Sequence, residues 1–261
     1  MPAHPNASAA IFGAAILFSW ISAAAVPLRI ATLPGPCDVL FGYAATLGAR
    51  QGMHLKLAPQ SDVTAMNRAV ADGAAQAGAC ENTQTLHEAD SFSEKLAPAF
   101  YAVTLPIGIY SRHVHAVTQL RPGDTIVLPR SPVDRDRARV LLYNFGLLRA
   151  HEDDGLNPDF SNIVNPIGFK LEEVQPAALP ARLADAGAVL LPYTIAVRAG
   201  LQPAKDSIGF EDGRSAYAGA VIVRTTDLKA PWVMTLKHLF QSRQMRQFIY
   251  DRYGDSVRPP W

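Results

Sequence analysis

The chain has 261 residues, of which 49% are hydrophobic and 18% are charged. This is an ordinary globular composition, and the length suffices for one large domain or for two lobes of about a hundred residues each. Its 24 Lys and Arg residues nearly balance 23 Asp and Glu residues, which gives a net charge of +1. Binding to phosphate backbones needs a basic excess, so we expect no nucleic-acid partner.

The first 25 residues differ from the rest of the chain. An unbroken apolar run from Ala9 to Ile21 is followed by small residues, in which Ala23 and Ala25 form an A-x-A cleavage pattern. The run is shorter than the roughly 20 residues of a membrane-spanning helix. Although no Lys or Arg precedes it, residues 1–25 are predicted to be a secretory signal peptide, and the protein is expected in the periplasm.

From residue 28 onward, short apolar runs alternate with amphipathic stretches, which is typical of an α/β protein. The predicted strands are residues 28–32, 54–57, 76–80, 125–128, 169–174, 188–191 and 218–224. The predicted helices begin at Asp38 and Asp62 and span 133–147, 179–186 and 194–199, with two more between 231 and 253. The apolar segment 99–110 contains Pro106 and Gly108, which suits a crossing between lobes better than a central strand.

These elements predict a two-lobed α/β fold, in which two crossover strands join two β/α lobes. Residues 26–110 would form the first part of lobe 1 and residues 111–217 would form lobe 2. Residues 218–261 would return to lobe 1 as a strand and the C-terminal helices. A ligand bound between such lobes can be enclosed by hinge closure.

Several short motifs occur along the chain, and their order is informative. They are PIGIYS at 106–111, LRPGDTIVLP at 120–129, PVDRDRA at 132–138, GLL at 146–148, NP at 165–166, LPARL at 179–183, AVRAGL at 196–201 and a closing Trp261. No single motif is specific, but their order and spacing resemble the NlpA family of methionine-binding lipoproteins. The resemblance implies the fold of a type II-like periplasmic binding protein. It also implies the extracytoplasmic solute-binding protein of an ABC importer, and not an enzyme.

The resemblance also implies a partner and a ligand class. The partner would be an ABC permease in the inner membrane, and the ligand a small polar solute that is amino-acid-like and carboxylate-bearing. We expect a monomer without cofactor or metal. The common enzyme motifs are absent from the sequence. The alternative is a non-transporting exported interaction or sensor module with a degenerate cleft.

The ligand positions of the family are largely substituted in this chain. Its aromatic stretch after the third strand is replaced by residues 78–85, and two of its Asn positions correspond to Pro192 and Gly219. Only Arg137, which the resemblance makes the partner of the ligand's carboxylate, is retained. L-Methionine is therefore expected to be a weak ligand at best. The candidate ligand-binding residues are Arg137, Cys37, Cys80, Glu81, Asn82, Thr85, Asp134, Pro192, Tyr193, Tyr217 and Gly219.

Arg137 lies near a predicted helix start in which Ser131 is the N-cap, Pro132 occupies the first helical position and Asp134 occupies the third. Asp134 stands where the family usually has Asn. A guanidinium beside a helix N-terminus can bind a carboxylate. The alternative is that Arg137 pairs with Asp134 on a solvated helix face.

The two cysteines, Cys37 and Cys80, follow strands that should end at the same edge of the sheet. They could form a disulfide, line the pocket as thiols, complete a soft-metal site with Glu81 or a His, or be small buried residues that never meet. Cys37 follows Pro34-Gly35-Pro36, a poor context for acylation, so lipid anchoring is doubtful.

His113 and His115 form an H-x-H pair after the predicted crossing. On a strand both side chains would share one face and could bind a metal. An exposed surface pair is the interpretation that we favour.

Overall fold

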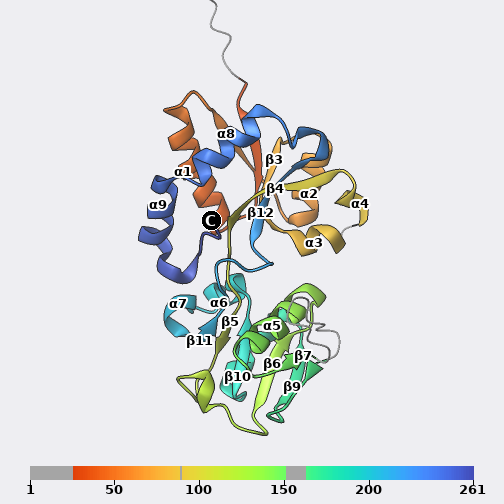
Figure 1. Cartoon of the computed structure of the whole chain (residues 1–261), viewed down its shortest axis with the longest axis vertical. Coiled ribbons are helices and arrows are strands. Elements are labelled where there is room, and N and C mark those ends of the chain that lie inside the picture. Colours follow the sequence, from red (N-terminus) through yellow and green to blue (C-terminus); the bar gives the residue numbers. More distant parts are fainter. Residues whose placement is uncertain (1–25, 89, 151–162) are drawn as a thin grey trace, which may run out of the picture.

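The computed structural model describes residues 26–88, 90–150 and 163–261. These residues form two lobes along the long axis of the molecule (Figure 1), each built around a five-stranded mixed sheet. The predicted signal peptide lies outside the described residues. The two-lobed α/β arrangement confirms the predicted fold class.

The first lobe contains the sheet with strand order β2-β1-β3-β12-β4. Its strands are β1 (Leu28–Thr32), β2 (Leu55–Pro59), β3 (Ala77–Asn82), β4 (Leu96–Val103) and β12 (Gly219–Arg224). β1 pairs in parallel with β2 and β3, whereas β12 runs antiparallel to both β3 and β4. The strand that returns from the second lobe is therefore inserted into the first sheet, as the sequence predicted.

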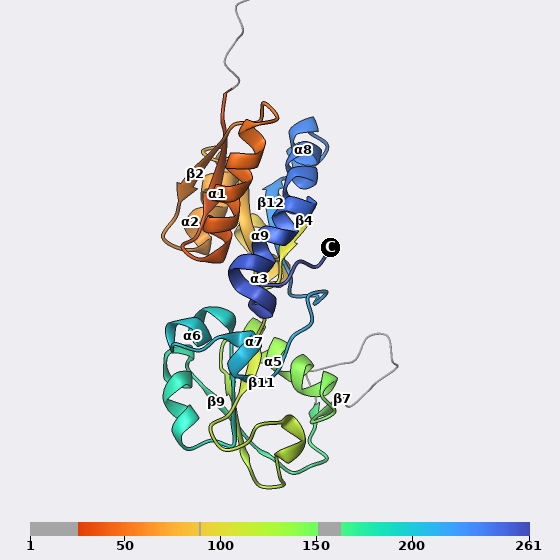
Figure 2. The same ribbon diagram turned by 90° about the vertical axis from the view of Figure 1, so that its left-hand side faces the viewer.

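Helices cover both faces of this sheet. They are α1 (Pro36–Ala49), α2 (Val63–Ala71), α3 (Thr83–Glu88), α4 (Asp90–Ser93), α8 (Pro231–Phe240) and α9 (Arg243–Tyr253). Buried side chains of α1, α8 and α9 share one apolar cluster, in which Phe41 and Phe240 have ring centroids 4.8 Å apart. Buried residues of α2 and α3, among them Met66 and Leu86, form a second cluster on the opposite face. Figure 2 shows the first lobe from the side on which α1 and α9 lie, with α8 beside them.

The second lobe contains the sheet with strand order β11-β5-β10-β6-β9. Its strands are β5 (Gly108–Tyr110), β6 (Thr125–Pro129), β9 (Lys170–Val174), β10 (Ala188–Leu191) and β11 (Ser207–Phe210), with a small separate pair β7 (Arg149–Ala150) and β8 (Ile163–Val164). β6 is parallel to β9 and β10, and β5 is antiparallel to β10 and β11. Because β5 pairs in this sheet, the chain enters the second lobe a few residues before the boundary at residue 110 that we expected.

The helices of the second lobe are α5 (Pro132–Asn144), the 3-10 helix η2 (Pro176–Ala184), α6 (Tyr193–Arg198) and α7 (Pro203–Asp206). α5 packs one face of the sheet with Leu141 and Leu142, whereas η2 and α6 pack the other with Leu179, Leu183 and Ala196. Pro180 lies inside η2 and has no backbone N–H, which accounts for a 3-10 segment where an α-helix was predicted. Within the described ranges, no helix has the length and apolar character needed to span a membrane.

Two chain segments cross between the lobes, and the C-terminal tail joins them. The first crossing, residues 104–107, lies between β4 and β5, and the second, residues 211–218, lies between β11 and β12. Arg258 exchanges two backbone hydrogen bonds with Thr104, of 2.7 and 3.0 Å, and its Nη1 donates to the carbonyl of Glu211 at 3.2 Å. The Thr104 hydroxyl donates to the carbonyl of Gly213 at 2.6 Å. Both crossings are therefore tied to each other and to the tail.

A disulfide joins Cys37 at the start of α1 to Cys80 on β3, across 43 residues of sequence. Of the alternatives that the sequence left open, the structure shows the disulfide. It links the helix and the strand beside the first apolar cluster, and it closes a loop that contains β2 and α2. Such a link stabilises the fold chiefly by restricting the unfolded chain.

We expect the double substitution Cys37→Ala with Cys80→Ala to lower the free energy of unfolding by about 4 kcal/mol, the value that chain-entropy arguments give for a loop of this length. Urea unfolding measures the difference. A reductant should destabilise the wild type and leave the double variant unchanged. A double variant within about 0.5 kcal/mol of the wild type would show that the disulfide does not stabilise the fold.

Candidate functional site

A cleft of about 480 Å³ lies between the two lobes. The lining residues come from the start of α2, from β3 and α3, from the first crossing, and from the starts of α5 and α6. They are Val63, Asn82, Thr85, Leu105, Ser131, Pro132, Val133, Asp134, Arg137, Pro192, Tyr193 and Thr194. About half of these side chains are apolar and half can form hydrogen bonds or carry charge, so the cleft suits a small solute with a polar head.

The strand topology explains why these residues meet. In an open α/β sheet, ligands bind where the parallel strands end and the following helices begin. β2, β3, β6 and β10 all end toward the cleft, and each is followed by a helix whose first residues line it. The N-terminus of α5 therefore faces the space between the lobes and adds a partial positive charge there.

Arg137 is the most extensively bonded side chain of the cleft. Its Nε lies 3.0 Å from both carboxylate oxygens of Glu211, and its Nη2 donates to Glu211 Oε2 and, at 2.7 Å, to the carbonyl of Leu105. Both side chains of the pair are 9% exposed. Glu211 also accepts hydrogen bonds from the Ser215 hydroxyl and from the backbone N–H of Ile107. One buried ion pair thus joins α5 to both crossings.

This arrangement corrects the prediction that Arg137 either pairs with Asp134 or offers its full fork to a ligand. The Nε and Nη2 side of the guanidinium is occupied by Glu211 from the second crossing, because the strand order brings that crossing over α5. Nη1 donates no hydrogen bond to a described residue, so this group remains for a ligand in the cleft. The aromatic ring of Tyr217 lies 5.6 Å from the guanidinium carbon and adds a cation–π contact.

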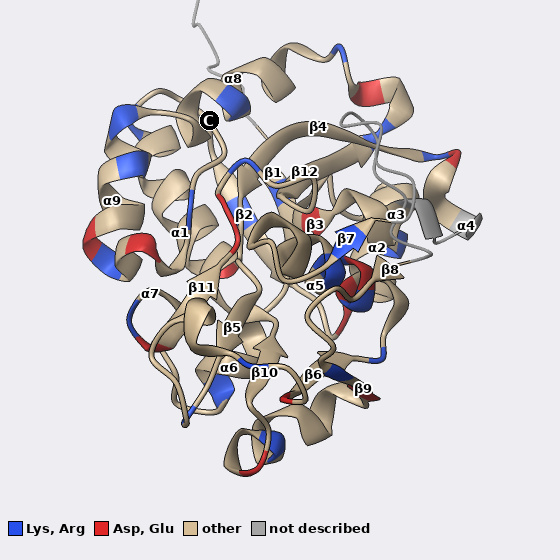
Figure 3. Ribbon diagram, turned by 60° about the horizontal axis from the view of Figure 1, so that its bottom comes forward, with Lys and Arg blue, Asp and Glu red and all other residues tan. Residues whose placement is uncertain are grey.

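Asp134 is half-buried on the first turn of α5, where Figure 3 shows acidic and basic residues side by side. Its Oδ2 accepts a hydrogen bond of 2.9 Å from the Ser131 hydroxyl. Ser131 is the N-cap residue of α5 and Pro132 begins the helix, as predicted, but the Ser131 side chain makes no hydrogen bond to the helix backbone. No Lys or Arg of the described chain lies within ion-pair distance of the Asp134 carboxylate.

Neutral hydrogen-bonding groups complete the lining. Asn82 accepts a hydrogen bond from the backbone N–H of Gln84 through its Oδ1, which leaves its amide nitrogen for the cleft. Burial, with a smaller contribution from Tyr253, raises the pKa of the Tyr193 phenol to about 12. Tyr193 therefore stays protonated and can donate a hydrogen bond. The structure brings the candidate residues Asn82, Thr85 and Tyr193 to the cleft together with Pro192.

Other candidate residues lie behind the cleft and do not line it. Cys37 and Cys80 are joined to each other, and Cys80 has a φ of 57°, an unusual left-handed conformation for a residue other than glycine. Gly219 pairs opposite Asn82, and a Cβ there would lie 2.8 Å from the Cys80 carbonyl oxygen and 3.1 Å from that of Val103. Glycine at this position is thus required by close backbone packing.

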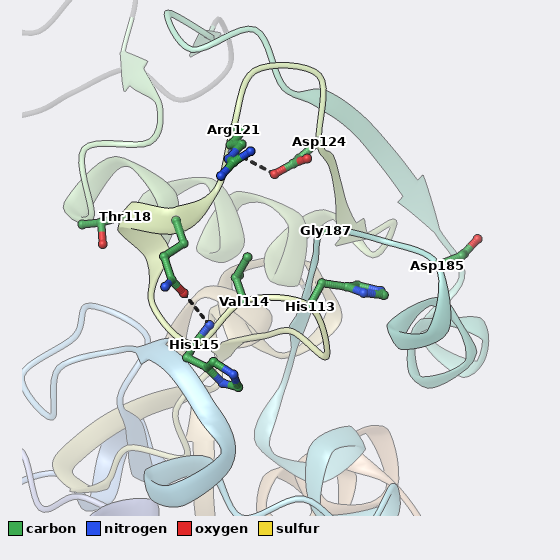
Figure 4. Close-up of a pocket in the computed structure, with 9 residues that line it drawn as sticks. His113, Val114, His115, Thr118, Arg121, Asp124, Asp185 and Gly187 are labelled. Carbon is green, nitrogen blue, oxygen red and sulfur yellow. Dashed lines mark hydrogen bonds between the residues drawn. The ribbon is translucent and has the colours of Figure 1, made fainter.

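A larger hollow of about 780 Å³ lies at the end of the second lobe away from the cleft, and it contains His113 and His115. Figure 4 shows the two rings pointing in different directions, with His113 toward the side of Asp185. Both histidines are exposed, and no group of three His, Cys, Asp or Glu residues in the described part of the chain could hold a metal ion. The hollow lies on one lobe only, so we do not regard it as the ligand site.

Sequence reasoning missed several residues of the site, above all Glu211. It lies 74 residues from Arg137, and no periodic pattern marks it. A charged residue in the segment that returns between the lobes is the one signal that could have identified it. Leu105 was missed because it lies inside the apolar segment 99–110 assigned to a crossing, and Val63 because it begins a helix whose apolar face was expected to pack on the sheet.

Glu81 is buried beneath α2, where it is 3% exposed. Asn67 Nδ2 donates to its Oε1 at 2.8 Å, but Glu81 Oε2 and Asn67 Oδ1 are buried without a hydrogen-bond partner among the described residues. Burial raises the pKa of the carboxyl from 4.5 to about 7, although the Asn67 bond acts in the opposite direction. Glu81 is therefore a buried acid behind the cleft and not a ligand-lining residue.

Because the folded state holds the Glu81 proton more tightly, the contribution of Glu81 to stability should be greatest below pH 4.5 and be lost as the pH rises through about 7. Glu81→Gln should remove this decline and be more stable than the wild type at pH 8 by up to about 3 kcal/mol, since its amide can also donate to Asn67. Urea unfolding between pH 4 and pH 8 measures the difference. The exposed Glu94→Gln serves as the control, and a difference between Glu81→Gln and wild type that does not vary with pH would contradict the assignment.

Comparisons with known proteins agree with the two-lobed geometry. The family model for the NlpA lipoprotein matches residues 28–261. A probable D-methionine-binding lipoprotein of Vibrio cholerae is 30% identical over 215 residues, which cover 81% of this chain and 80% of the relative.

Two solved structures are similar over nearly their whole length. A periplasmic ABC-transporter substrate-binding protein from Coxiella burnetii has a TM-score of 0.74 and 28% identity, covering 89% of this chain and 99% of the other. A nutrient-binding protein from Burkholderia cenocepacia, bound to methionine, has a TM-score of 0.72 and 27% identity, covering 88% and 98%. The predicted resemblance is confirmed: the chain belongs to the NlpA lipoprotein family, whose members are substrate-binding proteins of ABC transporters and not enzymes.

Proposed function

We propose that this protein captures a small, carboxylate-bearing, amino-acid-like solute in the cleft between its lobes and delivers it to an ABC permease in the inner membrane. The observation that carries the proposal is Arg137, whose Nη1 remains for a ligand while its other side is held by Glu211. The N-terminus of α5 lies beside it, and a guanidinium together with a helix N-terminus favours an anionic group.

The hinge supports enclosure of the solute. The crossings at 104–107 and 211–218 join the described parts of the lobes, and the tail adds contacts through Arg258 and through Ser256, whose hydroxyl accepts a hydrogen bond of 3.1 Å from the backbone N–H of Ala204 in α7. A lobe rotation about these segments would close the cleft on a ligand, which is how two-lobed receptors exclude water from a bound solute.

A thermal-shift screen of amino acids, dipeptides and small carboxylic acids tests the proposal. A ligand that binds only the folded state adds about 2.7 kcal/mol of stability at a hundredfold excess over its Kd. L-Methionine should be weak, with no submicromolar affinity by calorimetry, because Pro192 of the cleft lining offers no side-chain hydrogen bond. A screen in which nothing shifts the melting temperature would instead favour an exported interaction or sensor module.

Arg137→Lys should lower the affinity for the strongest carboxylate ligand of that screen by about tenfold or more. Lysine keeps a positive charge opposite Glu211, but its single nitrogen cannot reproduce the separate positions of Nε, Nη1 and Nη2, since it lacks the planar fork. Calorimetry at one salt concentration measures the change, with Arg135→Lys on the same helix as the control. Equal affinities of wild type and Arg137→Lys would show that Arg137 does not bind the ligand.

We propose further that the protein is exported without a lipid on Cys37 and acts as a monomer. The A-x-A pattern at Ala23 and Ala25 supports removal of residues 1–25. Both cysteines of the sequence are engaged in the disulfide, so neither sulfur is available for acylation. On this proposal the chain would differ from relatives whose names call them lipoproteins.

A further inference from the structure

The structure also points to the charge of the ligand's second polar group. We propose that Asp134 binds a positively charged group of the solute, so that the cleft accepts zwitterions and cations and rejects anions. The inference rests on the proposed function, because it assigns a specificity-determining residue within the same cleft.

The charges of the cleft lead to this proposal. Asp134 and Arg137 are the two charged residues among those that line it. The charge of Arg137 is matched by Glu211, which contacts its Nε and Nη2 from behind. These three side chains therefore leave the cleft with one excess negative charge, which lies on Asp134.

Asp134 has acceptor capacity that the protein does not use. Its Oδ2 accepts from the Ser131 hydroxyl, whereas its Oδ1 accepts no hydrogen bond from a described residue. No backbone N–H of the described chain donates to this carboxylate, so the Asp134 side chain does not cap the N-terminus of α5. A half-buried carboxylate with a vacant oxygen at the wall of a cleft is a natural partner for an ammonium group.

The surroundings favour selection by charge. Apolar lining residues adjoin Asp134, namely Pro132, Val133 and Pro192. They reduce the water that could screen a charge in the closed cleft. A solute with a carboxylate near Arg137 Nη1 and an ammonium near Asp134 would satisfy both groups, whereas an anion without an amine would leave Asp134 unpaired.

The test uses charge series built on leucine and on methionine. Each series comprises the free amino acid, its C-terminal amide, which is cationic, and its N-acetyl derivative, which is anionic. Calorimetry is run at pH 6.5, where the α-amino groups are protonated. We expect the wild type to bind the free amino acid and the amide at least tenfold more tightly than the N-acetyl derivative.

Asp134→Asn should lower the affinity for both amines by about tenfold and leave the N-acetyl derivative unchanged or improved. Asp136→Asn removes the same charge from the same helix outside the cleft lining and should leave the ranking unchanged. If Asp134→Asn does not fold, the order of affinities of the three compounds for the wild type still tests the proposal. A wild type that binds the N-acetyl derivative as tightly as the amines would overturn it.

The remaining outcomes separate this inference from the function on which it rests. An unchanged ranking in folded Asp134→Asn would overturn the role of Asp134 while leaving the solute-binding function intact. Binding of no member of either series, nor of any compound in the broader screen, would overturn both.

Discussion

The buried pair between Arg137 and Glu211 is the interaction on which the cleft depends. Two charges removed from water are tolerated only when geometry and additional hydrogen bonds offset the cost of desolvation. Here Leu105, Ile107 and Ser215 supply those bonds, so the pair is anchored in α5 and in both crossings at once. The same contact that positions Arg137 for a ligand also fixes the place where the lobes meet.

The pair also determines the chemistry of the cleft. Because Glu211 matches the charge of Arg137, the carboxylate of the proposed ligand would meet a single remaining nitrogen rather than a bidentate fork. The negative charge of Asp134 then becomes the dominant unpaired side-chain charge of the lining. Family membership fixes the two-lobed receptor, but these local contacts decide which solute fits.

Much of the fold could be predicted from the sequence, because hydrophobic periodicity and capping residues are local signals. The β/α alternation, the Asp62 cap of α2 and the two helices between residues 231 and 253 are all found in the structure. Where the local signal was ambiguous, the prediction was less accurate: Pro180 turned a predicted α-helix into a 3-10 helix, and β11 was missed.

The site was less predictable, since its decisive contacts join residues that are far apart in sequence. Arg137 could be identified by resemblance, but its partner Glu211 depends on how the second crossing passes over α5. Glu81 stands next to Asn82 in the sequence, yet strand alternation directs it under α2 while Asn82 reaches the cleft. Side-chain direction at the end of a strand separates these two residues, and neither composition nor spacing reveals it.

A double-mutant cycle between Arg137 and Glu211 tests the central claim most directly. The free energies of unfolding of the wild type, Arg137→Met, Glu211→Gln and the double variant give the coupling between the two side chains. The account predicts that each single change leaves a buried partner unsatisfied and that the coupling is about 2 kcal/mol or more. Additive effects, within about 0.5 kcal/mol, would contradict it by showing that the pair does not organise the cleft.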